Sequence, residues 1–309
     1  MNNKQSLPAV SVIVPTYNRP HSLPVTLDSI AKQTFRDFEV IVINDAGNSA
    51  ADIIRDFSNK FCINYIEHET NKGLSAARNT GIRAARGKYI AYLDDDDIYY
   101  PDHLETLVRF LEGSDYFIAY TDAYRSNIIE KKGKIIEVEK DMPYSQDFDY
   151  EQIFIDNFIP VLCVVHQKSC LEKAGFFDET LKRNEDWDMC IRLAINYKLF
   201  HIKKVTCEFT SRTDGTSMTS SGIVPFWESR AKIYEKYVNI TSNLPNVVAS
   251  QILKLSEIIQ RFTTLGGEIK AIDYMLLLKK IKDIEESKTY KTGYFILKPF
   301  KYLINVFKA

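Results

Sequence analysis

Four consecutive aspartates, Asp94 to Asp97, are the strongest chemical signal in this sequence of 309 residues. They directly follow Tyr89 to Leu93, an apolar run that predicts a buried strand. Two unit charges about 4 Å apart repel each other by roughly 1 kcal/mol in water, and by more at a lower dielectric. Hard divalent cations favour carboxylate oxygens and also bind substrate phosphates, so this position favours a Mg²⁺ or Mn²⁺ site. The alternative is a solvated acidic loop that caps the next helix.

A second segment, Asn71 to Asn79, could bind an anion. Gly73 would let the backbone approach a phosphate closely at the start of a predicted helix, whose N-terminus favours negative charge. Arg78 could add a bidentate donor for phosphate oxygens. The alternative is an ordinary surface arginine in the middle of a helix.

A third segment, Glu185-Asp186-Trp187, opens another predicted helix. A carboxylate here could take a proton from an attacking hydroxyl, and the ring of Trp187 could pack on a sugar. The alternative is a plain helix N-terminus, capped by Asn184 and followed by acids that the helix dipole favours.

Strand and helix patterns alternate along the first hundred residues. Apolar, β-branched runs predict strands at 10–14, 39–43, 63–66 and 89–93, and helical spacing predicts helices at 22–33, 49–58 and 73–85. This alternation predicts an α/β fold in three layers, with a mostly parallel central sheet and helices on both faces. Ligands of such sheets bind outside the carboxyl ends of the strands, where Thr16, Asp45 and the four aspartates stand.

The pattern changes in the second part of the chain. It predicts strands at 116–120, 156–166 and 201–209, a hairpin tip at 131–134, a helix at 185–196 and almost wholly helical structure after Phe226. We therefore expect two domains, a catalytic domain over residues 1–225 and a helical C-terminal extension over residues 226–309.

Composition excludes several classes of protein. The chain is 45% hydrophobic and has a formal net charge of -1, so it can bury a large core and does not suit a polyanionic partner such as nucleic acid. Its 5 cysteines contain no Cys-x-x-Cys pair, which is typical of neither a disulfide framework nor a zinc site. With no apolar stretch of signal-peptide type at the start, we expect a cytoplasmic protein.

The last residues form a distinct segment. After Glu286 there are lysines, aromatic residues and aliphatic residues but no acid. Such a segment could lie on anionic lipid at the inner face of the cell membrane, as a peripheral contact. The alternative is a terminal helix that packs on its own domain or on a second subunit in a homo-oligomer.

Taken in order, three segments resemble the family 2 glycosyltransferases of the GT-A fold. They are Val10 to Arg19, the Asp-x-Asp segment after Tyr92-Leu93, and Glu185-Asp186-Trp187. Supporting matches are Gln33 to Phe35, Asn44 to Gly47, Ala77 to Gly81 and Gly175 to Asp178. Where the family usually has a pair of acids, this chain has Asn44-Asp45, so only the second acid is retained.

The resemblance implies a metal-dependent, inverting transfer of a sugar from a nucleotide-sugar, with UDP-sugars favoured, to an acceptor hydroxyl. The acceptor would be a glycan or a lipid-linked molecule in surface polysaccharide synthesis. By similarity, Pro15, Thr16, Tyr17 and Asn18 would lie along the nucleotide, Asp45 would bond the base, Arg78 would lie near the nucleotide, and Asp94 or Asp95 would contact the ribose. Asp96 would bind Mn²⁺ or Mg²⁺, and Asp186 would be the catalytic base, with Glu185 as its neighbour.

Three other functions remain open at this point. A nucleotide-sugar-binding subunit without turnover would not need both the metal acids and the base. A nucleotidyltransferase would favour a glycine-rich basic loop, and Thr16 to Pro20 is not one. A membrane-docking scaffold would leave the N-terminal motifs unexplained.

Overall fold

The computed structural model describes residues 7–131, 134–212 and 223–264. The chain divides into two compact units, and each is described by itself. The first comprises residues 1–148 and 158–221, and the second comprises residues 149–157 and 222–309. The predicted tail segment after Glu286 lies outside the described residues. Among the residues that the structure describes, no helix is long and apolar enough to cross a membrane.

The first half of the sheet in the first unit is parallel. Its strands are β1 (Val10–Thr16), β2 (Phe38–Asn44), β3 (Cys62–Glu67) and β4 (Tyr89–Tyr92), in the order β3-β2-β1-β4. The helices between them are α1 (Leu23–Ala31), α2 (Ala51–Phe57) and α3 (Leu74–Ala84). β1, β2 and β4 are buried over their whole length, as continuous apolar runs predict. The expected strand–helix alternation is confirmed.

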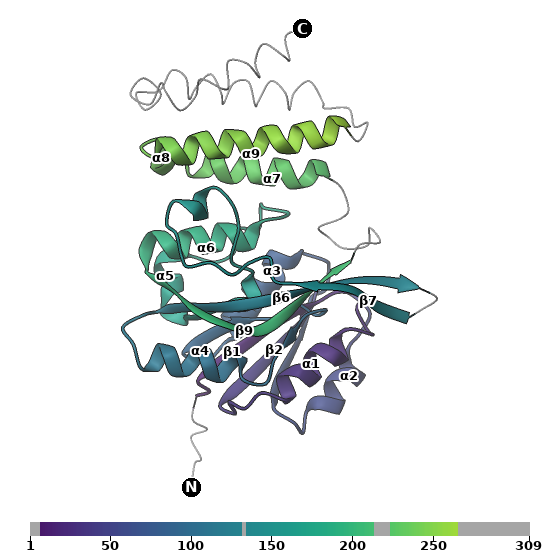
Figure 1. Cartoon of the computed structure of the whole chain (residues 1–309). Helices are drawn as coiled ribbons and strands as arrows, with labels where there is room; N and C mark the ends of the chain where they lie inside the picture. Colours follow the sequence, from purple (N-terminus) through teal and green to yellow (C-terminus); the bar gives the residue numbers. More distant parts are fainter. Residues whose placement is uncertain (1–6, 132–133, 213–222, 265–309) are drawn as a thin grey trace. The chain divides into compact units, whose positions relative to one another are not determined.

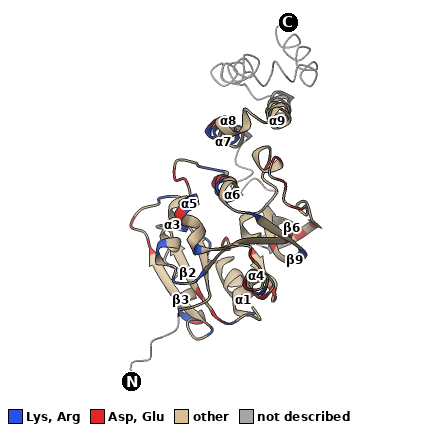
Figure 2. Cartoon of the chain, turned by 90° about the vertical axis from the view of Figure 1, so that its left-hand side faces the viewer, with Lys and Arg blue, Asp and Glu red and all other residues tan. Residues whose placement is uncertain are grey.

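The other half of the sheet mixes strand directions. It continues through β8 (Val164–Gln167), β6 (Ile118–Lys131), β9 (Leu199–Arg212) and β5 (Ile98–Tyr99), while β7 (Lys134–Asp141) forms a hairpin with β6. β6 is antiparallel to β8 and parallel to β9. The helices of this half are α4 (His103–Glu112), α5 (Leu171–Ala174) and α6 (Glu185–Asn196). Figures 1 and 2 show α1 and α4 on one face of the sheet and α3, α5 and α6 on the other.

Two sequence-based boundaries are wrong in this half. The strand predicted at 156–166 is a strand only from Val164 onward, and is preceded by the 3-10 helix η2 (Val161–Cys163). Pro160 has no N–H to donate to a neighbouring strand, and a continuous apolar run cannot distinguish a buried turn from a buried strand. The strand predicted at 116–120 extends to Lys131 because its polar second half pairs with both β7 and β9.

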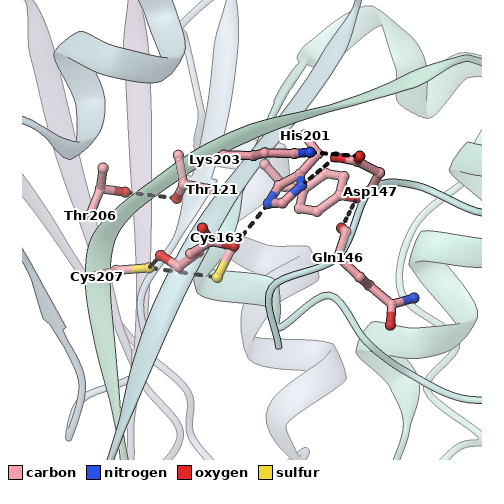
Figure 3. A network of polar contacts seen from close by, with 10 residues as sticks. Thr121, Gln146, Asp147, Cys163, His201, Lys203, Thr206 and Cys207 are labelled. Carbon is pink, nitrogen blue, oxygen red and sulfur yellow. Dashed lines mark hydrogen bonds and ion pairs between the residues drawn. The ribbon is translucent and has the colours of Figure 1, made fainter. Parts of the chain in front are cut away.

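The loop after β7 is fastened to this long β6–β9 pair by a polar network (Figure 3). The imidazole of His201 lies between two carboxylates, with Nε2 at 2.8 Å from Asp122 and Nδ1 at 3.0 Å from Asp147. Lys203 forms a second ion pair with Asp147. These contacts attach residue 147 of the loop to the sheet.

The second unit is helical, with one short addition. Its helices are α7 (Ile223–Lys236), α8 (Val238–Thr241) and α9 (Pro245–Thr264). Residues 149–157, which include the 3-10 helix η1 (Gln152–Phe154), belong to the same unit. Arg230 donates to Asp156 and to the carbonyl of Ile155, and Gln251 donates to the carbonyl of Phe154. No sequence pattern indicated that this segment joins the helices.

Gly87 illustrates how the sequence can mislead about a glycine. A glycine just after a helical pattern commonly ends the helix in a left-handed conformation, but α3 ends at Ala84 and the next residue is already extended. A Cβ at Gly87 would lie 2.6 Å from the backbone nitrogen of Ser11. Gly87 is therefore needed because its backbone passes close to β1, rather than for a left-handed conformation.

A buried histidine joins β4 to β8. His166 is fully buried, and its Nδ1 donates to the carbonyl of Gln167. Its Nε2 then accepts from the hydroxyl of Tyr92 at 2.9 Å, which fixes the neutral ring. Burial lowers the pKa of His166 to about 4.

This histidine makes stability depend on pH. Because the pKa of His166 is lower in the folded chain than its ordinary value of about 6.5, the unfolded chain binds the proton first as pH falls. The stability that neutral His166 contributes is complete above about pH 6.5 and is lost as pH falls toward 4. We expect His166→Gln to remove about 2–3 kcal/mol of the acid-induced decrease in unfolding free energy. Urea unfolding at pH 7 and 4.5 measures it.

The exposed His21, changed to Gln, is the control and should leave the decrease intact. An equal pH dependence in the wild type and in His166→Gln would contradict the assignment.

Candidate active site

The four aspartates continue the path of β4 beyond the edge of the sheet. The backbone N–H of Leu93 still donates to Ile13 on β1, and the N–H of Asp97 then donates to the carbonyl of Asp94 in a tight turn. Tyr99 fastens this turn, because its hydroxyl donates to the carbonyl of Tyr92 at 2.6 Å. The turn therefore places four consecutive carboxylates just beyond the carboxyl end of a buried strand.

Each carboxylate has a different partner. Asp94 accepts two hydrogen bonds from Arg78, Asp95 accepts from the Thr16 hydroxyl at 2.7 Å, Asp96 pairs with Arg19 at 2.6 Å, and Asp97 accepts from the backbone N–H of Thr210 at 2.9 Å. Separate partners keep the like charges apart and lower their mutual repulsion. Asp94 and Asp96 keep 30% and 21% of their side-chain surface, whereas Asp95 and Asp97 are buried. Of the two predicted ribose ligands, only Asp94 is therefore substantially exposed.

Arg78 is the central cation of the site. It stands on α3 and is 1% exposed, and its guanidinium joins Asp94 at 2.8 Å to Glu185 at 2.7 Å. Its carbon Cζ also lies 5.3 Å from the ring centre of Phe177. Burial by itself would lower the pKa of Arg78, but the charges of Asp94, Glu185 and Asp186 raise it.

This burial rules out the surface alternative for Arg78. The two terminal nitrogens of its guanidinium contact acids of the protein, Glu185 and Asp94. These contacts position two of the predicted site acids, and a direct contact of Arg78 with a nucleotide stays a prediction.

Glu185 and Asp186 begin α6, and the structure separates their environments. Glu185 is buried against Arg78, and burial raises its pKa while the Arg78 charge opposes that rise. Asp186 is partly exposed, and its Oδ1 accepts the backbone N–H of Trp187 at 2.8 Å in the first turn of the helix. Asn184 stands at the helix start with a positive φ of 59° and makes no side-chain cap. Of the two acids, Asp186 is the one that faces solvent.

The prediction that Trp187 lines a sugar pocket is wrong. Its side chain has 0% exposure and belongs to the core. Trp187 follows Asp186 on the helix, and neighbouring helical residues point in different directions, so an exposed Asp186 is compatible with an inward Trp187.

Asp45, the predicted base ligand, is engaged by the protein itself. It is buried, and its oxygens accept from the backbone N–H groups of Lys72 at 2.9 Å and Gly73 at 2.7 Å. His68 contacts the same carboxylate at 2.7 Å. Asp45 thus satisfies N–H groups just before α3 that we expected to face a phosphate. Its hydrogen bond to a nucleotide base stays a prediction.

The predicted nucleotide turn after β1 is partly exposed. Pro15 and Thr16 are buried strand residues, whereas Tyr17 is 48% exposed and Asn18 is exposed with a positive φ of 55°. The Asn18 side chain accepts from the N–H of Asn48 at 2.8 Å. This contact brings the ends of β1 and β2 together on the side where nucleotides bind α/β sheets.

The side chain of Asn44 orders the loop beyond β2. Its amide nitrogen donates to the carbonyl of Asn48 at 3.0 Å, and its oxygen accepts from the N–H of Gly47. A carboxylate cannot donate, so the departure from the family's acid pair has a structural consequence here. Gly47 has room only for a hydrogen, because a Cβ would lie 2.7 Å from the backbone nitrogen of Asn18.

The acidic turn fits a metal that is bound together with a substrate. Within the described part of the chain, no group of three or more His, Cys, Asp or Glu side chains could hold a metal by itself. Burial raises the pKa of Asp95 to about 7 and also raises the pKa of Asp96, because it disfavours the charged form of each carboxyl. The guanidinium of Arg19 already forms an ion pair with Asp96. Because Mg²⁺ is often held by one or two carboxylates plus substrate phosphates, Asp96 is a fitting single ligand.

Sequence reasoning missed three residues of this site. Arg19 ends the Val10 to Arg19 segment that resembles the family, but the sequence analysis gave it no role. Thr210 donates its N–H to Asp97 and its hydroxyl to the carbonyl of Asp96, and His68 contacts Asp45. Thr210 lies more than a hundred residues from the aspartates, so no local pattern could have linked them.

Residues 11–171 match the model of the family described as Glycosyl transferase family 2. The chain belongs to this family. It is therefore a glycosyltransferase, as its motifs predicted. The uncharacterized glycosyltransferase YwdF of Bacillus subtilis is 31% identical over 199 residues, 64% of this chain and 71% of that protein. An uncharacterized glycosyltransferase of Haemophilus influenzae is 26% identical over 300 residues, 90% of this chain and 92% of that protein.

Solved structures confirm the GT-A fold. TarS 1-349 of S. aureus in complex with UDP-GlcNAc has a TM-score of 0.64 at 19% identity, covering 90% of this chain and 81% of that one. The mannosyltransferase PcManGT of Pyrobaculum calidifontis, in complex with GDP-Man and Mn²⁺, has a TM-score of 0.60 at 16% identity, covering 94% and 84%. At this identity the likeness concerns the fold.

The buried bridge through Arg78 should dominate the stability of this family 2 domain. Removing one partner of a buried ion pair typically costs about 3–5 kcal/mol, because a charge is left buried without compensation. We expect Arg78→Met to lower the unfolding free energy by about that amount. Adding Glu185→Gln should restore part of the loss, since it removes one of the two stranded acids. Urea unfolding of the single and double variants measures both effects.

An Arg78→Met chain as stable as the wild type, or a double variant whose losses simply add, would contradict the bridge. The exposed pair of Arg55 with Asp52 supplies the control, because Arg55→Met should change stability by less than about 1 kcal/mol.

Proposed function

We propose that this glycosyltransferase moves a sugar from a nucleotide-sugar, a UDP-sugar in the first place, to an acceptor hydroxyl with inversion at the anomeric carbon. One observation carries the proposal: Arg78 joins Asp94, at the end of β4, to Glu185, at the start of α6. This bridge puts the candidate donor-binding acids and the candidate base, Asp186, at the same edge of the sheet. Membership of family 2 supports it, as do fold neighbours in complex with UDP-GlcNAc or with GDP-Man and Mn²⁺.

In this proposal the donor lies across the carboxyl ends of β1 and β4. The exposed residues Tyr17 and Asn18 face the nucleotide. The carboxylate of Asp94 accepts a hydrogen bond from a ribose hydroxyl, while Arg78 holds this carboxylate in place. A carboxylate fixed by a buried arginine needs little rearrangement when the ligand binds. When bound at Asp96, Mn²⁺ or Mg²⁺ would neutralise charge on the diphosphate.

Asp186 is the base of the transfer. It is partly exposed, whereas Glu185 is already paired with Arg78 and is closed off from an acceptor. Ionised Asp186 takes the proton of the acceptor hydroxyl as that oxygen attacks the anomeric carbon. The bond from this carbon to the phosphate oxygen breaks, and the diphosphate leaves with the electron pair. One displacement inverts the centre, so an α-linked donor gives a β-linked product.

The acceptor belongs to the same proposal. We favour a glycan or a lipid-linked hydroxyl of a surface polysaccharide, reached from the cytoplasmic side of the membrane. The basic, aromatic tail after Glu286 is the segment that would contact lipid, or else a second copy of the chain.

A donor screen tests the transfer and the metal role together. The purified chain is incubated with Mn²⁺ or Mg²⁺ and with UDP-, GDP-, CMP- or dTDP-sugars, and nucleotide release is measured. We expect release from a UDP-sugar, abolished by EDTA and lowered at least about 100-fold by Asp96→Ala, because transition-state charge then lacks compensation. Asp115→Ala removes an exposed aspartate and should change nothing. Failure of every donor to bind or react would count against the proposal.

The base is tested by Asp186→Asn, which keeps the shape of the side chain but cannot take a proton. We expect kcat to fall by about 10²–10⁴, the usual contribution of general base catalysis, while donor affinity stays within about threefold. Glu172→Gln, at an exposed position of α5, is the matched control. If Asp186→Asn kept wild-type kcat, another group would have to be the base.

A further inference from the structure

Asp96, the carboxylate proposed as the metal ligand, already forms an ion pair with a positively charged side chain in the described structure. The guanidinium nitrogen of Arg19 lies 2.6 Å from Oδ2 of Asp96. Both side chains are partly exposed, with 29% and 21% of their surfaces accessible. By contrast, the carboxylate of Asp97 is buried and held by a backbone N–H, and Asp95 is buried against a hydroxyl. The Arg19 contact is thus the exchangeable one among these three.

The backbone of Arg19 is fixed while its side chain reaches solvent. Its carbonyl accepts the N–H of Leu23 at the start of α1, and the preceding Asn18 is held by the N–H of Asn48. A side chain on such an anchor can change rotamer without moving the turn. A guanidinium has five N–H donors in a planar fork that matches phosphate oxygens, and the observed contact with Asp96 uses one nitrogen.

We propose that Arg19 is the counter-ion of Asp96 in the absence of ligands. When the donor binds, the divalent cation replaces Arg19 at this carboxylate, and the Arg19 side chain changes rotamer and binds the diphosphate of the donor. The inference rests on the proposed function, since it concerns the same donor site. Arg19 lies in the Val10 to Arg19 segment, but the sequence analysis gave it no role.

The exchange couples the metal to the donor. A cation that arrives alone must displace Arg19, which then loses its carboxylate partner. When a diphosphate is present, the metal gains phosphate oxygens and Arg19 gains a new anionic partner. Each ligand therefore binds more tightly in the presence of the other, and this coupling is reciprocal.

Mn²⁺ and UDP binding to the full-length chain test the exchange without any turnover. Free Mn²⁺ is measured by electron paramagnetic resonance, with and without UDP, and UDP binding is measured by calorimetry at saturating Mn²⁺. The variants are Arg19→Gln, Arg19→Lys and Asp96→Asn. Arg55→Gln, which removes a charge on the exposed surface of α2, is the matched control.

Arg19→Gln should move the two affinities in opposite directions. Mn²⁺ alone should bind about tenfold more tightly than to the wild type, within the 5–150-fold span of common couplings, and UDP should bind more weakly at saturating Mn²⁺. Arg19→Lys, which keeps a cation, should lie between the two, and Arg55→Gln should match the wild type. Asp96→Asn should abolish Mn²⁺ binding.

Two results would overturn the inference while leaving the proposed function intact. The first is an Mn²⁺ affinity of Arg19→Gln that equals that of the wild type. The second is UDP binding to Arg19→Gln that is as tight as to the wild type. In both cases Asp96→Asn would still lose the Mn²⁺ binding that the wild type shows. Absence of Mn²⁺ binding by the wild type even with UDP would overturn both the inference and the metal site on which it rests. Circular dichroism melting confirms that each variant is folded.

Discussion

A single buried guanidinium unites the two acidic segments of this glycosyltransferase. Taking the charges of Arg78, Asp94 and Glu185 out of water costs free energy, which is offset only when the contacts are short and well directed. Here the distances are 2.7 and 2.8 Å, and the ring of Phe177 lies close to the cation. The bridge fixes the start of α6 relative to the end of β4, two elements about a hundred residues apart in the sequence. The position of Asp186 follows from that of Glu185, since the two are adjacent on one helix.

The acidic turn obeys a second electrostatic constraint. Four adjacent carboxylates at the end of a buried strand can coexist because each has its own donor, whether an arginine, a hydroxyl or a backbone N–H. Burial nevertheless raises the pKa of Asp95 and of Asp96, because it disfavours their charged forms. The exposed side of the turn is where the proposed function places a divalent cation, together with the phosphates of the donor.

How much of this the sequence predicted depends on the range of the interactions. The strands of the parallel half and the helix at 185–196 were predicted because apolar periodicity is a local property. The family motifs singled out Asp94, Asp96 and Asp186, and the roles assigned to these three acids stay predictions. The burial of Trp187 and Arg78 could not be predicted, because it depends on which elements pack over α6 and α3. Likewise, the grouping of residues 149–157 with α7 and α9 arises from contacts across 74 to 97 residues.

The anomeric form of the sugar that the enzyme first releases tests the proposed inverting mechanism most directly. With an α-linked nucleotide-sugar and no acceptor, water takes the place of the acceptor hydroxyl beside Asp186. Proton nuclear magnetic resonance, recorded early enough to precede mutarotation, distinguishes the two anomers. We expect the β anomer to appear first, because a single displacement assisted by Asp186 inverts the centre. Initial release of the α anomer would contradict that mechanism and the role of Asp186 as its base.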